Sequence, residues 1–130
     1  MSVLDAPPGI YRGTVEGIES GHCTARMEVR AAPGGCLIVD YEAVSDAHGL
    51  QHVEHALVSA DALHVAFGEA PGVTVFGLVA PGVYETAGEP TMRIHTAYDD
   101  GELSWAWHWG PAGEEPIERS RARCRRVPEP

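Results

Sequence analysis

The chain contains no lysine and little positive charge of any kind. All nine basic residues are arginine, set against 19 acidic residues, and the formal net charge is −10. A surface this acidic repels phosphate backbones and anionic lipid headgroups. We therefore expect neither nucleic acid nor a membrane as a partner. Five arginines do cluster near the C-terminus, where we expect them to pair with carboxylates on a solvated face. They are Arg119, Arg121, Arg123, Arg125 and Arg126.

Long apolar runs and paired cysteines are also missing. No stretch of about 18 apolar residues occurs, which argues against a transmembrane helix. The opening MSVLDAPPGIYRG lacks the basic and apolar regions of a secretory signal. The three cysteines, Cys23, Cys36 and Cys124, are widely spaced and form no C-x-x-C pair. We expect free, reduced thiols and a cytoplasmic location.

The fingerprints of the common catalytic and cofactor sites are absent. We find no nucleophile elbow, phosphate-binding loop or dinucleotide-binding glycine motif. The seven histidines show neither an H-x-H nor an H-E-x-x-H pattern, and a zinc site needs three or four converging ligands. We therefore predict no metal site and no cofactor.

What the chain does contain is a regular alternation of short strand-like segments and turn signals. Its 130 residues and 44% hydrophobic content fit one domain, 1–130, with loose ends at 1–8 and 128–130. Clusters of glycine, proline and aspartate recur about every 8–12 residues, as is typical of all-β sandwiches and barrels. Examples are 33–35, 46–49, 68–72, 88–90, 99–101 and 110–116.

Between these turns, apolar residues recur with a period of two. The clearest run places Leu103, Trp105, Trp107 and Trp109 on one face of a strand. Asp99-Asp100-Gly101 and Pro33-Gly34-Gly35 each join two such runs and predict hairpins. We predict about eight to ten strands in an antiparallel up-and-down meander. Closure into a barrel would remove the exposed edges, so the predicted fold is an all-β barrel.

One segment fits two patterns. Its apolar residues follow a helical stripe from His52 to Phe67, with Gly68 as a C-cap. The same segment also divides into strands 51–58 and 63–67, with a turn near Asp61. We predict the two strands, because a lone helix in a meander must still find a docking place. A helix would instead favour an α+β roll.

The tryptophan stripe is the main candidate for a ligand-binding surface. Trp105 and Trp107 would form walls that stack on an aromatic or polyene ligand, although the same rings also suit an ordinary core. Tyr41, on another alternating run, is a further ligand-binding candidate. Arg93 and His95 share a face on the strand before the tryptophans, and we predict them as the polar anchors of the ligand.

His52 and Glu54 form a second polar pair. They are two residues apart, so on a strand they project from the same face. Such a pair could act as acid and base. We expect this face to be the polar outer surface of the sheet, and the acid–base role is the alternative.

The opening strand Gly9-Ile10-Tyr11-Arg12-Gly13, the long second strand closing on Pro-Gly-Gly and the repeated hairpins resemble the calycin group of barrels. That group includes lipocalins, fatty-acid-binding proteins and related bacterial lipocalin-like domains. The resemblance implies an internal cavity for a small apolar or amphipathic ligand. It also makes Arg119 and Arg121, in a late-strand Arg-Ser-Arg, candidates for holding a carboxylate, while the alternate residues Ser120, Ala122 and Cys124 suit a packed interior. The glycine-rich opening with Trp and Tyr-Pro of the haem-binding nitrobindins is absent, so haem is not expected.

These observations support three functions. The first is binding of a small hydrophobic or aromatic molecule inside the barrel. The second is a cavity enzyme, cyclase- or isomerase-like, acting on a polyene or polyketide-like substrate through shape and one or two hydrogen-bond donors. The third is an interaction protein that uses a strand edge. Assembly into a homodimer is left open.

Overall fold

The structure is a computed structural model that describes residues 2–17 and 22–128. Two short 3-10 turns, η1 (Val3–Asp5) and η2 (Pro33–Gly35), accompany ten strands. The strands are β1 (Gly9–Gly17), β2 (Cys23–Ala32), β3 (Cys36–Ser45), β4 (Gly49–Val58), β5 (Ala62–Phe67), β6 (Thr74–Ala80), β7 (Val83–Glu85), β8 (Arg93–Asp99), β9 (Glu102–Trp109) and β10 (Ile117–Arg126).

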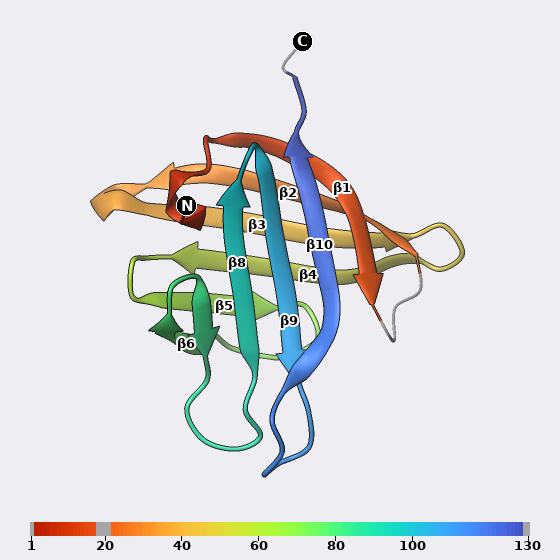
Figure 1. Cartoon of the computed structure of the whole chain (residues 1–130). Helices are drawn as coiled ribbons and strands as arrows, with labels where there is room; N and C mark the ends of the chain where they lie inside the picture. The colour runs from red at the N-terminus through yellow and green to blue at the C-terminus, as the bar shows by residue number, and fades with distance from the viewer. Residues whose placement is uncertain (1, 18–21, 129–130) are drawn as a thin grey trace.

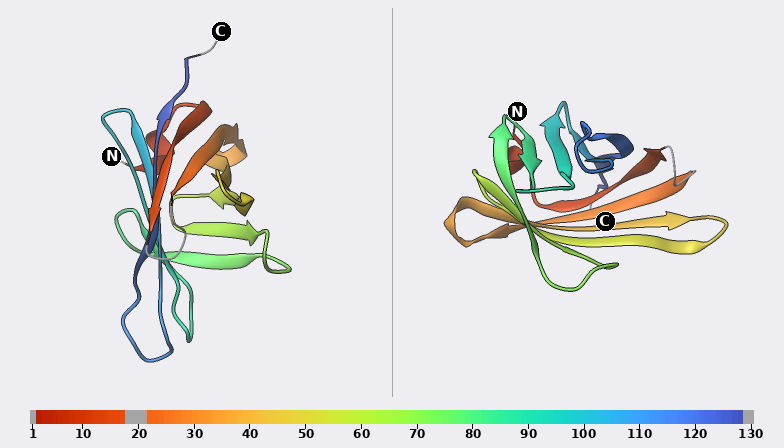
Figure 2. Two further views of the ribbon diagram at one scale, coloured as in Figure 1. Left: turned by 90° about the vertical axis from the view of Figure 1, so that its right-hand side faces the viewer. Right: turned by 90° about the horizontal axis from the view of Figure 1, so that it is seen from below.

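The ten strands form one closed antiparallel barrel in which each strand pairs with its neighbours in the sequence, and β1 pairs with β10. This confirms the predicted all-β barrel and its predicted number of strands. In Figure 1 strands β2 to β4 run across the view, whereas β8 to β10 run steeply over them. Figure 2 shows these two groups of strands on opposite sides of the interior.

The segment from 52 to 67 is strand, not helix. It lies in β4 and β5, which pair with each other from Glu54 opposite Phe67 to Val58 opposite Leu63. The turn between them is closed by the Ser59 amide, which donates to the Ala62 carbonyl at 2.9 Å. The prediction of two strands is therefore confirmed.

The hairpin predicted at 99–101 is a tight two-residue turn between β8 and β9. Asp100 and Gly101 both have positive φ, at 50° and 77°, as a type I′ turn requires. This turn sets the register that places Ile94 opposite Trp107 and Thr96 opposite Trp105. It therefore decides which residues of β8 share the inner face with the tryptophans.

Glycines allow the first and last strands to meet. A Cβ atom at Gly13 would lie 1.7 Å from the backbone oxygen of Arg123, and one at Gly17 would lie 2.4 Å from that of Arg119. Real side chains cannot occupy such positions, so the two strands approach this closely only because β1 carries glycine there. The closure of the barrel depends on these two positions.

The N-terminal segment 2–8 packs on the barrel, contrary to the expectation of a loose end; residue 1 and most of the loose end expected at 128–130 lie outside the described residues. Val3 and Ala6 are buried in the core, and the Tyr11 hydroxyl donates to the Pro7 carbonyl at 2.7 Å. Burial of two apolar side chains, one hydroxyl hydrogen bond and the 3-10 turn η1 hold this segment in place. In the described part of the chain, no helix is long and apolar enough to span a membrane.

Candidate functional site

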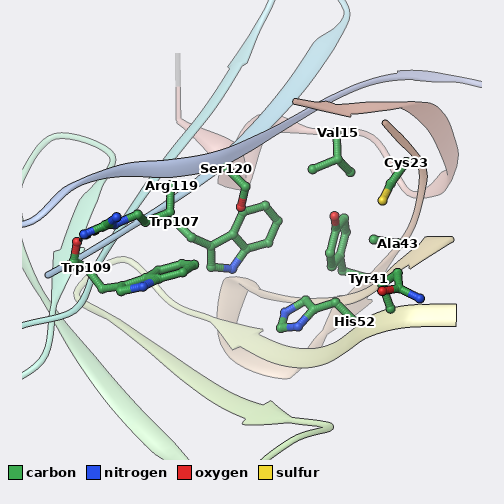
Figure 3. Close-up of a pocket in the computed structure, with 10 residues that line it drawn as sticks. Val15, Cys23, Tyr41, Ala43, His52, Trp107, Trp109, Arg119 and Ser120 are labelled. Atoms are coloured by element: carbon green, nitrogen blue, oxygen red, sulfur yellow. Dashed lines mark hydrogen bonds between the residues drawn. The ribbon is translucent and has the colours of Figure 1, made fainter. Parts of the chain in front are cut away.

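One end of the barrel is hollow. The cavity there has a volume of about 280 Å³. Its lining comes from the last parts of β1, β3 and β9 and the first parts of β2, β4 and β10, which meet at one end of the barrel. The lining residues are Val15, Cys23, Tyr41, Ala43, Gln51, His52, Trp107, Trp109, Arg119 and Ser120, most of which Figure 3 labels.

Aromatic rings form much of this wall. Tyr41 and Trp107 lie on facing strands with ring centroids 4.9 Å apart and planes tilted by 45°. The His52 ring meets Trp107 edge-on, with centroids 5.9 Å apart. Trp109 extends the wall toward β10 (Figure 3). A flat apolar molecule entering this space would contact ring faces and edges, for which aromatic pairs have favourable geometries.

A bulge in β10 turns two consecutive side chains toward the cavity. The pairing with β9 shifts register between Glu118 and Ser120, so both Arg119 and Ser120 line the cavity instead of only one of them. Bulges commonly re-aim side chains in this way. Arg119 also donates from Nε to the Trp109 carbonyl at 3.1 Å, which holds its guanidinium beside the cavity.

A buried carboxylate lies behind the aromatic wall. The Glu54 side chain is only 1% exposed. Its Oε1 lies 2.6 Å from Nε2 of His52 and accepts a hydrogen bond from Nε1 of Trp107. Nδ1 of His52 pairs with Glu69, so His52 lies between a buried and a half-exposed carboxylate. Oε2 of Glu54 has no hydrogen-bond partner in the described part of the chain.

Burial and neighbouring charges shift the pKa values of Glu54, His52 and Tyr41. Burial raises the pKa of Glu54, and the hydrogen bond and charge of His52 offset part of that rise. Burial lowers the pKa of His52, but the hydrogen bonds and charges of Glu54 and Glu69 outweigh it, so the pKa is raised overall. Burial, followed by the charge of Glu54, raises the pKa of Tyr41. His52 thus holds its proton more tightly than a free imidazole does, and Tyr41 stays a neutral phenol.

The expectation that His52 and Glu54 face solvent is wrong. Glu54 shares its face with the buried residues Ala56 and Val58, whereas the exposed face of β4 carries Val53 and Leu57. Because β4 has apolar residues on both faces, the two-residue period alone does not show which face is inward. Hydrogen bonds from His52 and Trp107 make burial of the Glu54 carboxylate tolerable.

The cavity contains two of the residues predicted to bind the ligand. Tyr41 and Trp107 both line it. Trp105 points inward as well and is 1% exposed, but it belongs to the filled core and not to the lining. Trp109 lines the cavity and Trp105 does not, because only the last residues of β9 reach the hollow end of the barrel.

Arg93 and His95 lie on the outer face of β8, not beside the cavity. The same strand turns Ile94 and Thr96 inward. Arg93 pairs with Glu85 at 3.3 Å and with Glu115 at 2.8 Å, and the His95 ring stacks on His108 with centroids 4.0 Å apart. Their predicted position was wrong because a shift of one residue in a strand exchanges its two faces.

The arginines that the family resemblance suggested are separated by the bulge. Arg119 lines the cavity, whereas Arg121 faces outward and pairs with Glu118 at 2.7 Å. A regular strand would place both on one face, so the sequence carried no signal for this difference. Val15, Cys23, Gln51 and Ser120 were also not predicted, because strand ends and bulges decide their position.

No family model matches the chain, and no curated protein matches it. Among solved structures, one match is the crystal structure of Rv2717c from M. tuberculosis. The two chains superpose with a TM-score of 0.66 over 93% of this chain and 92% of that one, at 15% sequence identity. The similarity establishes the barrel fold. At this level of identity it carries no information about ligand or activity.

Proposed function

We propose that this barrel binds a small hydrophobic or aromatic molecule in the cavity at its hollow end, in the manner that the resemblance to calycin barrels implies. The observation that carries the proposal is the aromatic wall of Tyr41, Trp107 and Trp109 around that cavity. Ligand sites are typically concave and mostly apolar, with a few placed polar groups. The lining of Val15, Ala43 and the three rings has this character.

The size of the cavity supports a small ligand. Its volume of about 280 Å³ lies just below the usual range of about 300–1,000 Å³ for ligand pockets. A compound of one or two fused rings suits this space better than a long-chain lipid does. The bulk of the barrel interior is filled by core side chains such as Trp105, Phe76 and Met27.

Titration with a neutral fluorescent naphthylamine tests the proposal. We expect a saturable rise in probe emission, together with quenching of tryptophan emission. Ala43→Leu places a larger side chain in the cavity and should weaken binding at least tenfold. Ala97→Leu, on the outer face of β8, is the matched control and should leave binding unchanged. Non-saturable emission, or equal binding by both variants, would contradict the proposal.

A second candidate is supported by the pair of His52 and Glu54. An imidazole that lines a cavity and is backed by a buried carboxylate resembles the acid–base groups of enzymes that move protons. The reaction class is isomerisation or cyclisation of a polyene or polyketide-like ketone, in which protonated His52 would give a proton to one carbon and the neutral imidazole so formed would take one from another. Incubation of an unsaturated ketone in heavy water should then lead to deuterium uptake seen by mass spectrometry. The uptake should be lost in His52→Gln, whereas binding without uptake leaves only the first function.

A further inference from the structure

One tyrosine hydroxyl, which faces the cavity, lacks the protein partner that its counterparts have. Tyr11, Tyr41 and Tyr84 are all buried. The Tyr11 hydroxyl donates to the Pro7 carbonyl at 2.7 Å, and that of Tyr84 donates to the Ser59 carbonyl at 3.5 Å. Tyr41 is 3% exposed and lines the cavity, yet its hydroxyl bonds to no residue in the described ranges 2–17 and 22–128. Buried tyrosine hydroxyls usually have a partner, so this one is available to whatever occupies the cavity.

The Tyr41 hydroxyl can donate a hydrogen bond to a ligand, but it is poorly suited to bind a ligand in its ionised, phenolate form. Burial and the nearby charge of Glu54 both raise the pKa of Tyr41, so the group remains a neutral phenol. A neutral phenol donates one strong hydrogen bond along its O–H direction. The complementary ligand group is therefore an acceptor.

A second hydroxyl reaches the same space from another strand. Ser120 lines the cavity because of the bulge in β10, and its Oγ has no bond to any described residue. In Figure 3 the Tyr41 oxygen points toward Val15, and the Ser120 oxygen points toward the edge of the Trp107 ring. Two donors and aromatic walls together specify a flat molecule with one acceptor oxygen.

The charges near the cavity favour an uncharged acceptor. Glu54 lies directly behind His52 and Trp107, and Glu69 pairs with the other side of His52. Two acidic side chains flank the His52 ring, so an anionic ligand group placed beside Tyr41 would lie close to acidic groups on this side of the cavity. Arg119, on the β10 side of the cavity, would instead favour an anionic ligand. The test therefore includes a carboxylate ligand.

We propose that the cavity selects a conjugated carbonyl compound, an aryl ketone or aldehyde, whose oxygen accepts hydrogen bonds from Tyr41 and Ser120. This rests on the proposed binding function and adds the chemical class of the ligand. The aromatic walls hold the conjugated part, and the two hydroxyls hold its oxygen.

The experiment uses two probes of nearly equal shape, naphthyl methyl ketone and isopropenylnaphthalene, in which a CH₂ group replaces the carbonyl oxygen. Affinities come from displacement of the fluorescent naphthylamine. Because one neutral hydrogen bond contributes about 0.5–1.5 kcal/mol, Tyr41→Phe should weaken ketone binding by roughly two- to tenfold. It should leave alkene binding unchanged, which also shows that the variant is folded. The infrared carbonyl band of the bound ketone should shift upward in Tyr41→Phe.

Tyr11→Phe is the matched control. It also removes one buried phenolic hydroxyl, but that hydroxyl is already bonded to Pro7, and neither probe should lose affinity. The inference would be overturned if the wild type bound the ketone and the alkene equally tightly. It would also be overturned if Tyr41→Phe changed neither the affinity for the ketone nor its infrared carbonyl band. Either result would leave the binding function intact. If neither probe binds, the binding function itself fails. Tighter binding of naphthoate than of the ketone, lost in Arg119→Gln, would also overturn it by showing that the acceptor is anionic.

Discussion

At the scale of single residues, Glu54 determines the character of the site. Its carboxylate is buried among aromatic rings and is held by His52 and Trp107 through one oxygen. A buried charge is tolerated only when it is paired and hydrogen-bonded. Trp107 thus has two roles, since its ring forms the cavity wall and its N–H supports the carboxylate.

Trp107→Phe separates these two roles. The substitution keeps an aromatic ring but removes the N–H, so Glu54 loses one of its two partners. We expect a loss of about 1–3 kcal/mol in the free energy of unfolding, the usual cost of a buried polar group left without a partner. Urea unfolding at neutral pH measures it. The same substitution in a Glu54→Gln background, where no charge loses a partner, should cost less, and equal costs would contradict this account.

At the scale of elements, two strand pairings decide the barrel. The tight hairpin between β8 and β9 sets which residues accompany the tryptophans inside. The pairing of β1 with β10 closes the sheet, and it needs glycine where the two backbones approach most closely. These pairings place Val15, Trp107 and Ser120 around one space.

Gly13→Ala should disturb the closure. Its methyl group would overlap the backbone oxygen of Arg123, so β1 and β10 must separate. Overpacking of this kind costs about 1–3 kcal/mol or more. Gly77→Ala is the control in β6, where a Cβ would meet no atom within 4 Å, and its stability should stay near that of the wild type. Thermal unfolding followed by circular dichroism compares the two variants.

The stacked His95 and His108 rings give the β8–β9 pair a pH dependence. Burial, then the charge of Arg93, lowers the pKa of His95, and burial, then the charge of His95, lowers the pKa of His108. Since both folded pKa values lie below the unfolded value of 6.5, protonation favours the unfolded state. The stability from the neutral rings is present above about pH 6.5 and is lost as the pH falls through the folded values.

We therefore expect His108→Gln to flatten the decline of the melting temperature below about pH 6.5. His52 has the opposite sign. Its pKa is raised, so its contribution is present below the unfolded pKa and is lost as the pH rises through the folded one. His52→Gln should accordingly lower the melting temperature most below the unfolded pKa and flatten its decline as the pH rises above that value. Melting temperatures of both variants across the pH range, relative to wild type, test the two signs.

At the scale of the whole molecule, the barrel has a filled end and a hollow end. The N-terminal segment, anchored through Val3, Ala6 and the bond between Tyr11 and Pro7, covers part of the core. The cavity lies where β1, β3 and β9 end. A ligand at that end would add contacts that the unfolded chain cannot make.

Ligand binding should therefore stabilise the whole barrel. A ligand that binds only the folded state at 100 times its Kd adds about 2.7 kcal/mol to the free energy of unfolding. Calorimetry with naphthyl methyl ketone should show a melting temperature that rises with ligand concentration. Ala43→Leu, in which a larger side chain occupies the cavity, should show a much smaller rise at the same ligand concentration. A similar rise in that variant would place the binding site elsewhere.

Much of this architecture is readable from the sequence because strands obey a strict local period. The alternation around Trp107, the Asp100-Gly101 turn and the division of 52–67 into two strands all follow from neighbouring residues and turn geometry. The same rules placed Tyr41 and Trp107 on the inner face. The identity of the aromatic rings that face the cavity was thus partly predictable.

The sequence by itself indicated about eight to ten strands in an antiparallel meander, because strands and hairpins depend on short-range hydrophobic alternation and turns. Only the tertiary structure decided that Glu54 is buried, that Arg119 and Ser120 both face inward, and that Arg93 and His95 do not. The physical reason is that these positions depend on a bulge, on the closure of β1 against β10 and on hydrogen bonds across the barrel. All three involve residues far apart in the chain, which no local period encodes.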